Sequence, residues 1–396
     1  MKPAPTSIDL FCGCGGFSLG LKQAGFELLA AIDHDPKAIE VFKANFQDID
    51  PEFVLQRDLT TYNPEDLEVL IGTDRVDIIV GGPPCQGFSN ARQNQGANHG
   101  PRFVEDPRRM LYQDFLRFVK HFQPSIFVME NVLGIRTCEG GQYFDRVHDE
   151  AQELGYEVRA LVIKASDYGV PQKRQRQLFI GTKVPVRLPA LWEIPSLWES
   201  GQVTLGHAIG DLPPVRVGSG KDPRKYDLQL RKKHYAKYCG HWHRQVLEIN
   251  LADELTGHRA RYHSLRDLDV FAQLKPGEHA TQAEKRLGRL LDFPYNRGTF
   301  HDRYTRQHRD ELCSTIVAHL AKDGLMFIHP TQNRSLTVRE AARVQTFPDW
   351  FHFPVARTHQ FRLIGNAVPP LVARAIATSL ASKIAGRTEG IHFVHY

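Results

Sequence analysis

Val76-Asp-Ile-Ile-Val80 is followed at once by Gly-Gly-Pro-Pro-Cys-Gln-Gly-Phe-Ser89. A short apolar run of this kind, bounded by turn residues, is typical of a buried strand of a sheet. The two prolines before Cys85 fix two φ angles, and Gly81 and Gly82 let another group approach the backbone closely. The stretch therefore predicts an α/β sheet in which the carboxyl end of one strand presents a cysteine as a candidate nucleophile.

Strands and helices alternate on both sides of this stretch. Apolar runs predict strands at residues 7–11, 28–32, 76–80 and 125–129, and helices are expected at 17–24, 36–45 and after Asp106-Pro107. Behind that dipeptide, Leu111, Phe115, Phe118, Val119 and Phe122 form one apolar face at helical spacing. This alternation predicts the α/β class with a doubly wound, mostly parallel sheet.

The pattern changes after Lys183. Prolines cluster, regular periodicity fades, and helical signals return at residues 337–345 and 369–384. We therefore predict two domains, because 396 residues exceed one ordinary core. The first comprises residues 1–184 plus 357–396 and the second, smaller and irregular, comprises residues 185–356, with its most variable part at about 189–300.

The composition is that of a soluble globular protein, with 41% hydrophobic and 24% charged residues. The sequence has no apolar run long enough to span a membrane, and its six cysteines lack the spacing of a disulfide framework. We expect no signal peptide, because residues 1–11 lack a basic start and a long apolar stretch. A reduced cytoplasmic protein is expected.

The net charge is only +5, but basic residues gather at residues 216–244, where nine Lys/Arg face two Asp. The aromatic residues among them are Tyr226, Tyr235, Tyr238 and Trp242. Such a stretch can neutralise phosphates and stack on bases, although a solvated surface explains it equally well.

Glycines and acidic residues follow the first strands. Gly13 and Gly15 lie in the turn after the first strand, Asp33 ends the second strand, and Asp58 follows residues 54–57. The glycine spacing differs from G-x-G-x-x-G, so a dinucleotide is a poorer fit than another adenosine-type cofactor. Each carboxylate alone is better explained as a cap, but together at successive strand ends they predict a nucleoside pocket.

Charged residues also mark the later strands. Glu130 closes the strand at 125–129, at the edge where such sheets bind ligands, although a cap or a salt bridge would also explain it. In the run 172–176, strand alternation puts Arg174 and Arg176 on one face, where two guanidinium groups would suit a carbonyl oxygen and a carboxylate or phosphate.

Two other features were weighed. The polar loop 86–105 directly follows the candidate nucleophile and is long for a compact domain, which favours an active-site lid. Cys239, His241 and His243 lie close together, but no fourth ligand is suitably spaced. We therefore predict no metal site.

In this order, these pieces resemble the DNA (cytosine-5) methyltransferases of bacterial type, which are class I S-adenosylmethionine-dependent enzymes. The stretches that carry the resemblance are DLFCGCGGFSLGL, AIDHD, QRDL, GGPPCQGFS, MENV, QKRQRQLFIG, RSLTVREAARVQTFPDW and IGNAVPP. They cover most of residues 7–183 and 331–370. The resemblance implies a Rossmann-like methyltransferase fold, with a target-recognition domain that contacts DNA.

The resemblance also implies a cofactor site for S-adenosyl-L-methionine. Its residues would be Phe11, Gly13, Gly15, Asp33, His34, Asp58, Asn366 and Val368. Phe11 would stack on the adenine, Asp33 would hold the ribose and Asp58 would contact the adenine amine. Many family members have glutamate where Asp33 stands and tryptophan where His34 stands, so His34 offers less stacking than the family pattern.

The catalytic residues implied by the resemblance are Cys85, Glu130, Arg174 and Arg176. Cys85 would attack carbon 6 of a cytosine flipped out of the duplex, and Glu130 would assist with a proton at the ring. Arg176 would bind the cytosine carbonyl oxygen, and Arg174 would orient the base.

The expected reaction is methyl transfer to carbon 5 of cytosine in a specific double-stranded DNA sequence. The enzyme would act beside a cognate restriction endonuclease in a restriction-modification system, or alone. We expect a monomer without membrane contact, cytoplasmic and associated with the nucleoid when bound to DNA.

Three alternatives were considered. A tRNA cytosine-5 methyltransferase of the same fold would usually lack the long recognition segment and GGPPCQGFS. A binding module without catalysis would not need intact Cys85, Glu130, Arg174 and Arg176. A nicotinamide-dependent oxidoreductase fits the sheet but not the cysteine motif.

Overall fold

The computed structural model describes residues 3–84, 107–184, 186–189, 192–198, 201–238, 241–248, 254–293 and 303–385. Cys85 and the predicted lid at 86–105 lie outside the described residues. The chain forms two compact units: unit 1 contains residues 1–164, 175–197 and 370–396, and unit 2 contains residues 165–174 and 198–369. Residues 357–369 thus group with unit 2, whereas we expected them in the first domain; the functional domain boundaries stay a prediction.

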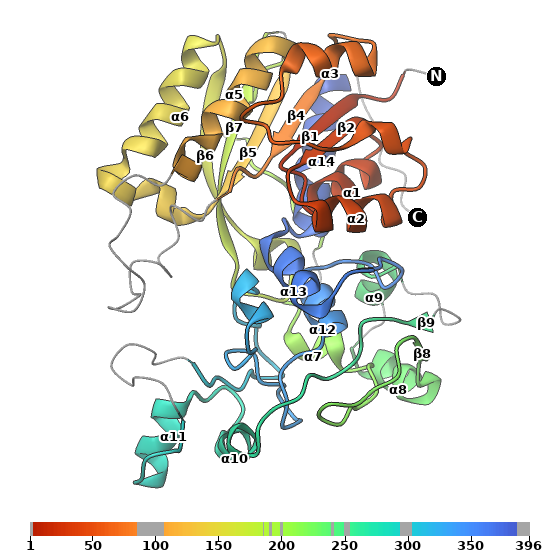
Figure 1. Ribbon diagram of the computed structural model, residues 1–396, viewed down its shortest axis with the longest axis vertical. Helices are drawn as coiled ribbons and strands as arrows, with labels where there is room; N and C mark the ends of the chain where they lie inside the picture. The colour runs from red at the N-terminus through yellow and green to blue at the C-terminus, as the bar shows by residue number, and fades with distance from the viewer. Residues whose placement is uncertain are drawn as a thin grey trace. The chain divides into compact units, whose positions relative to one another are not determined.

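Unit 1 is built on a seven-stranded sheet in the order β3-β2-β1-β4-β5-β7-β6 (Figure 1). The strands are β1 (Thr6–Leu10), β2 (Glu27–Asp33), β3 (Val54–Gln56), β4 (Ile78–Gly81), β5 (Ile126–Asn131), β6 (Glu157–Lys164) and β7 (Gln175–Thr182). Strands β1 to β5 pair in parallel, and β7 runs antiparallel between β5 and β6. The predicted α/β class with a mostly parallel sheet is confirmed.

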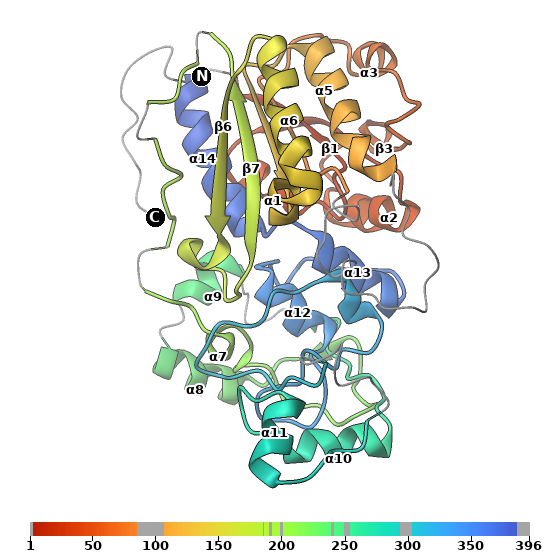
Figure 2. The same cartoon turned by 90° about the vertical axis from the view of Figure 1, so that its left-hand side faces the viewer.

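Helices cover both faces of this sheet (Figure 2). The helices of unit 1 are α1 (Gly16–Gln23), α2 (Pro36–Asn45), α3 (Pro64–Ile71), α5 (Leu111–Phe122), α6 (Gln142–Glu153) and α14 (Pro370–Ala385). Helices α5 and α6 lie on one face, and the predicted apolar face of α5 is buried there. Helix α14 lies against α1 on the other face, so the end of the chain packs back onto its beginning as expected.

Local signals explain where these helices begin and approach each other. The side chain of Asp35 accepts a hydrogen bond from Lys37 N (3.0 Å), and Pro36 occupies the first position of α2. On α1, a Cβ added to Gly20 would lie 2.4 Å from the Ala373 Cβ. Glycine is therefore needed where α1 and α14 cross.

Unit 2 consists of short helices joined by irregular chain, as predicted for the second domain. Its α-helices and strands are α7 (Leu205–Ile209), β8 (Arg224–Lys225), α8 (Leu228–Tyr238), α9 (His241–Val246), β9 (Glu254–Leu255), α10 (Leu265–Gln273), α11 (Ala280–Leu287), α12 (Val338–Val344) and α13 (Arg357–Asn366). The 3-10 helices of the two units are η1 (Pro51–Phe53), η3 (Pro107–Met110), η4 (Leu133–Arg136), η5 (Cys138–Gly141), η6 (Ala165–Tyr168) and η7 (Ala318–Ala321). A small apolar cluster around Phe271, Tyr304 and Ile328 supports α10 and α11.

One helical stretch, Arg357–Ile384, has the length and apolar composition of a membrane span. Within it, 72% of the most apolar window is buried inside the protein. Burial of this extent is typical of a core helix in a soluble protein.

Candidate functional site

The carboxyl ends of four parallel strands meet at one edge of the unit 1 sheet. Leu10 at the end of β1 faces Ile32 of β2 and Gly81 of β4, and Gly81 faces Met129 of β5. The residues that follow these strands therefore converge at the edge where open α/β sheets bind ligands.

The turn after β1 has unusual backbone geometry. Phe11 has φ 58°, and Gly13 and Gly15 have φ 55° and 90°. A non-glycine residue in this region is strained, and such strain gathers at functional sites. A Cβ built on Gly13 would meet no atom within 4 Å, so open space adjoins the turn, as a bound cofactor would require.

Asp33 connects this turn to the end of β2. Its Oδ2 accepts a hydrogen bond from Gly13 N (2.9 Å) and its Oδ1 accepts one from Asp35 N (2.8 Å). Each carboxylate oxygen has two lone pairs, so the oriented group retains capacity for ribose hydroxyls. The Nδ1 atom of His34 lies 3.3 Å from Asp33 Oδ1, and this contact raises the pKa of His34. The His34 side chain is 68% exposed.

Asp58 lies on the surface after β3. Its Oδ1 accepts hydrogen bonds from Thr60 N (2.9 Å) and Thr60 Oγ1 (2.8 Å), and these bonds lower the pKa of the Asp58 carboxyl. Among the described residues no donor is bonded to its Oδ2. A carboxylate held by one oxygen in this way could accept from an adenine amine with the other.

Asp9 is a residue of this region that the sequence analysis did not identify. It lies inside β1, is 1% exposed, and accepts a 2.5 Å hydrogen bond from Ser18 Oγ of α1. Burial, reinforced by the charge of Asp33, raises the pKa of Asp9 to about 7. The available signal was a charged residue within an otherwise apolar strand.

Glu130 and Arg176 are brought together at the end of β5. Arg176 Nε lies 2.7 Å from Glu130 Oε1, and their side chains are 14% and 11% exposed. The N–H bond of Arg176 does not point at Glu130 Oε1 with the geometry of a hydrogen bond, so we describe the contact as an ion pair. A Cβ on Gly82 would lie 3.5 Å from Glu130 Oε2, which places the Gly82 backbone beside the carboxylate.

Asn131, also at the end of β5, holds the turn that leads to Cys85. Its Nδ2 donates to Pro83 O (3.3 Å), its Oδ1 accepts from Val132 N (2.8 Å), and the residue is 1% exposed. Pro83 and Pro84 have no N–H, so the turn can be anchored there only through its carbonyls. MENV carried the resemblance, but no role was predicted for its asparagine.

Arg174 has a different environment from Arg176. It belongs to unit 2, is 2% exposed, and donates to Ile316 O (3.0 Å), Gly365 O (3.2 Å) and Ala367 O (2.9 Å). These bonds fix the backbone at Gly365 and Ala367, on either side of Asn366. Asn366 is exposed at the end of α13, and Val368, directly after Ala367, is half-buried. Strand β7 begins only at Gln175, so Arg174 does not take part in the predicted alternation.

The basic stretch at 216–244 is partly as expected. Most of its cations are exposed: Arg216, Lys221, Lys225, Lys232, Lys233, Lys237 and Arg244. Of the two interpretations of this stretch, base stacking does not apply to Tyr226 and Trp242, which are buried. Tyr226 donates to Asp349 and Trp242 donates to Gly169 O (3.0 Å), because each needs a partner for its polar atom inside the unit.

One buried group of side chains has the composition of a metal site. Potential ligand atoms of Asp211, His234 and His243 lie within 4.8 Å of one another. Asp211, however, already forms ion pairs with Arg343 and Arg231. Two guanidinium groups on this carboxylate would repel a divalent cation, so the group fits an ion network better.

Together, the strand order, the strained turn and the carboxylates at the strand ends define the Rossmann-like methyltransferase class. The chain belongs to the C-5 cytosine-specific DNA methylase family, whose model matches residues 6–382. The resemblance read from the sequence, and with it the predicted enzyme class, is confirmed.

Individual relatives agree with this assignment. The type II methyltransferase M.DdeI of Desulfomicrobium norvegicum is 37% identical over 393 residues, which cover 94% of this chain and 88% of the relative. The type II methyltransferase M1.HphI of Haemophilus parahaemolyticus is 35% identical over 95% of this chain and 86% of its own length. A solved DNA modification methyltransferase encoded within an E. coli prophage superposes with a TM-score of 0.72 at 28% identity, covering 96% of this chain and all of that one. Enzymes of this kind generally use S-adenosylmethionine.

Proposed function

We propose that this protein transfers the methyl group of S-adenosyl-L-methionine to carbon 5 of a flipped cytosine in double-stranded DNA, through a covalent adduct of Cys85. The observation that carries the proposal is the Glu130–Arg176 ion pair, 2.7 Å long, beside the backbone of Gly82, three residues before Cys85. The relatives' classification as type II methyltransferases supports DNA as the substrate.

The proposed steps use the chain's own groups in sequence. The thiolate of Cys85 adds to carbon 6 of the cytosine, which makes carbon 5 a nucleophile. The cofactor supplies an electrophilic methyl group on a sulfonium. Glu130 stabilises the ring by sharing a proton with its nitrogen, and Arg176 donates to the carbonyl oxygen. After transfer, loss of the carbon 5 proton to a base, for which water is a candidate, lets the C–S bond break and the thiolate leave.

The residues at the cofactor turn fit this cofactor. Asp33 would accept from the ribose hydroxyls, Asp58 Oδ2 from the adenine amine, and Phe11 would stack on the adenine. His34 would lie beside the same ring, with Gly13 and Gly15 near the methionine part. The assignment of Asn366 and Val368 to the same pocket rests on the resemblance, and so does base orientation by Arg174.

Further expectations concern the partners of the enzyme. We propose that unit 2 recognises a specific duplex sequence and that a restriction endonuclease shares this site, as the names of the relatives suggest for those proteins. We also propose that the enzyme acts as a monomer in the cytoplasm, associated with the nucleoid through DNA.

Labelled methyl transfer tests the proposal directly. Wild-type protein should label duplex DNA but not tRNA, and Cys85→Ala should abolish labelling while it retains cofactor binding by calorimetry. Labelling of tRNA alone would favour the tRNA enzyme, and persistent labelling of DNA by the variant would refute the covalent route. Bisulfite sequencing of DNA from expressing cells would then report the methylated base with its sequence context.

A further inference from the structure

Two segments of unit 2, residues 216–225 and 254–262, lie beside each other in opposite directions and are joined by strand pairing at one end and by single hydrogen bonds further along. Strands β8 and β9 are only the ends of this ribbon. Lys225 faces Glu254 and Arg224 faces Leu255 in the strands. Further along, Gly257 N donates to the Asp222 carboxylate (2.9 Å), Ala260 N donates to Ser219 O (3.1 Å) and Gly218 N donates to Arg261 O (3.1 Å). The two segments therefore form one two-stranded element, which we call the ribbon.

One side of the ribbon is anchored inside unit 2. His258, fully buried, is hydrogen-bonded to Thr337 Oγ1 (2.9 Å) and Pro213 O (2.8 Å). Arg261, 6% exposed, donates to Leu320 O (2.8 Å). The backbone N–H of Arg339, in α12, donates to Gly257 O (2.9 Å). These bonds fix the ribbon on α12, so its outward side chains start from a defined backbone.

The other side of the ribbon is cationic and carries an exposed aromatic ring. The two segments contain six Lys/Arg against two acidic residues, and of the six only Arg261 is buried. Arg216, Lys221 and Arg259 are exposed, and none of them is paired with a described residue. Tyr262 is 76% exposed, a high value for a large aromatic side chain.

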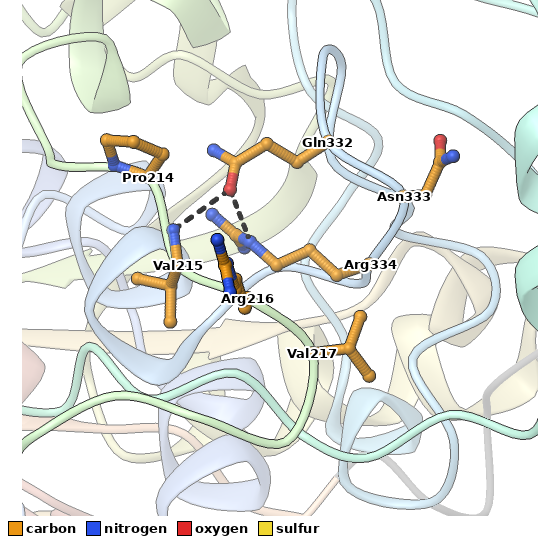
Figure 3. Close-up of a pocket in the computed structure, with 7 residues that line it drawn as sticks. All are labelled: Pro214, Val215, Arg216, Val217, Gln332, Asn333 and Arg334. Carbon is orange, nitrogen blue, oxygen red and sulfur yellow. Dashed lines mark hydrogen bonds between the residues drawn. The ribbon is translucent and has the colours of Figure 1, made fainter.

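A hollow of about 460 Å³ adjoins the ribbon, and Arg216 is one of the residues that line it (Figure 3). Its walls are the chain from Pro214 to Val217 and the chain from Gln332 to Arg334. Gln332 Oε1 accepts from Val215 N (3.1 Å) and Arg334 Nε (3.0 Å), which ties the two walls together. The segment that carries Arg216 is therefore held at both of its ends, by this bond and by the ribbon pairing.

We propose that the ribbon enters the major groove of the DNA substrate and determines which sequence is methylated. Arg259 and Tyr262 are the specificity-determining residues, and Arg216 and Lys221 contact phosphates. The major groove is wide enough for a two-stranded β-ribbon, and it displays the donors and acceptors that distinguish base pairs. Arg259 lies between buried His258 and Ala260, and Tyr262 lies between buried Arg261 and His263, so both side chains start from a fixed backbone. The inference rests on the proposed function, because it names the residues that would select the DNA sequence for that reaction.

The exposed lysines of α8 offer a competing DNA surface, and the two surfaces differ in consequence. If the α8 lysines contact only phosphates, their loss would weaken binding equally on all sequences. Loss of a residue that reads a base edge instead relaxes the sequence at one position.

The test compares ribbon variants of the full-length enzyme on a pool of random duplexes, with methylated sites read by bisulfite sequencing. Arg259→Ala and Tyr262→Ala should each relax at least one position of the site by roughly 10-fold or more. Arg216→Ala with Lys221→Ala should raise the KM for DNA and reduce the salt slope by about two, without changing the site. Lys285→Ala, exposed on α11 and away from the ribbon, is the matched control and should behave as wild type.

The outcomes separate this inference from the proposed function. If wild type methylates DNA at one site and both Arg259→Ala and Tyr262→Ala keep that site and its KM, the ribbon does not read DNA. If a triple Gln substitution of Lys232, Lys233 and Lys237 relaxes the site instead, specificity belongs to α8. If wild type methylates no duplex DNA, the proposed function itself fails, and the ribbon proposal falls with it.

Discussion

The two units of this protein are stabilised by different chemistry. In unit 1 the sheet is packed with apolar side chains, and Phe115, Phe118 and Phe127 are fully buried. In unit 2 the largest fully buried side chains are mostly charged: Arg174, Arg231, Arg334, Arg339 and Arg343. Unit 1 is therefore held by hydrophobic burial between regular layers, whereas unit 2 combines its apolar clusters with buried guanidinium groups.

The buried arginines compensate for the lack of regular structure in unit 2. Arg339 donates to Thr256 O (3.0 Å), Pro348 O (3.0 Å) and Phe351 O (2.8 Å), and Arg306 bonds to four further carbonyls. Buried carbonyls outside helices and sheets need donors, and one guanidinium supplies five in a fixed geometry. Irregular chain can thus be buried without the backbone hydrogen bonds of a helix or sheet, provided that arginine side chains donate to its carbonyls instead.

The strongest test of this contrast is Arg343→Leu. Arg343 lies between Asp211 and Asp349, and all three side chains are fully buried. Its removal leaves two buried carboxylates without their main partner, which should lower the free energy of unfolding by about 3–5 kcal/mol. Urea titration followed by tryptophan fluorescence suits the measurement, because Trp198, Trp242 and Trp350 all lie in unit 2.

Arg244→Leu, at an exposed arginine of the same unit, is the control and should change stability by less than about 0.5 kcal/mol. A loss below about 1 kcal/mol in Arg343→Leu would show that the network is not what stabilises unit 2.

The matching test in unit 1 is Gly20→Ala, which probes packing rather than charge. Alanine is the better helix former by about 1 kcal/mol, but its Cβ would lie 2.4 Å from both Ala373 Cβ and Arg374 N. Overpacking of this kind should cost about 1–3 kcal/mol, measured by urea titration followed by far-ultraviolet circular dichroism, which reports the helices and strands of unit 1. Lys43→Ala on the exposed side of α2 should be nearly neutral, and a stabilised Gly20→Ala would contradict the close packing of α1 and α14.

The same contrast explains what could be predicted from the sequence. The strands and helices that periodicity predicted in unit 1 agree with the structure to within about two residues, because apolar periodicity reflects burial in layers, but α3, α6 and β6 were not predicted. In unit 2 most of the largest buried side chains are arginines, which sequence patterns treat as surface residues. The burial of Arg343, and of Tyr226 beside Asp349, therefore had no signal in composition or spacing.

The candidate site divides in the same way. Asp33 and Glu130 could be predicted as site residues because each ends an apolar strand, and parallel strands end at one edge of the sheet. The partners of these residues were harder to predict, since they depend on tertiary contacts. The pairing of Glu130 with Arg176, the anchoring of Pro83 by Asn131, and the backbone bonds of Arg174 all join residues more than forty positions apart.

A third prediction concerns Asp9, the buried acid of unit 1. Its folded pKa of about 7 lies well above the ordinary value, so the folded state keeps a proton that the unfolded state loses. Its stabilising contribution is complete below about pH 4 and is lost as pH rises through 7, by up to about 1.4 kcal/mol per pH unit. Asp9→Asn should remove this slope between pH 5 and 7 in urea titrations, whereas Asp77→Asn, elsewhere at the sheet, should leave it in place. An unchanged slope in Asp9→Asn would show that another group titrates.

The smallest effect is expected for Asp48→Asn, which breaks the ion pair of Lys22 with Asp48 on the surface of unit 1. The Asp48 side chain is 64% exposed, so water and salt screen the attraction that lowers its pKa. The loss should be below about 1 kcal/mol at neutral pH, should fall further in 1 M salt, and should vanish as the pH drops below the pKa of Asp48. The Arg343 pairs, buried and desolvated, should show no such salt dependence. If Asp48→Asn proved as costly as Arg343→Leu, burial would not be what separates the two units, and the ion pairs of unit 2 would need another explanation.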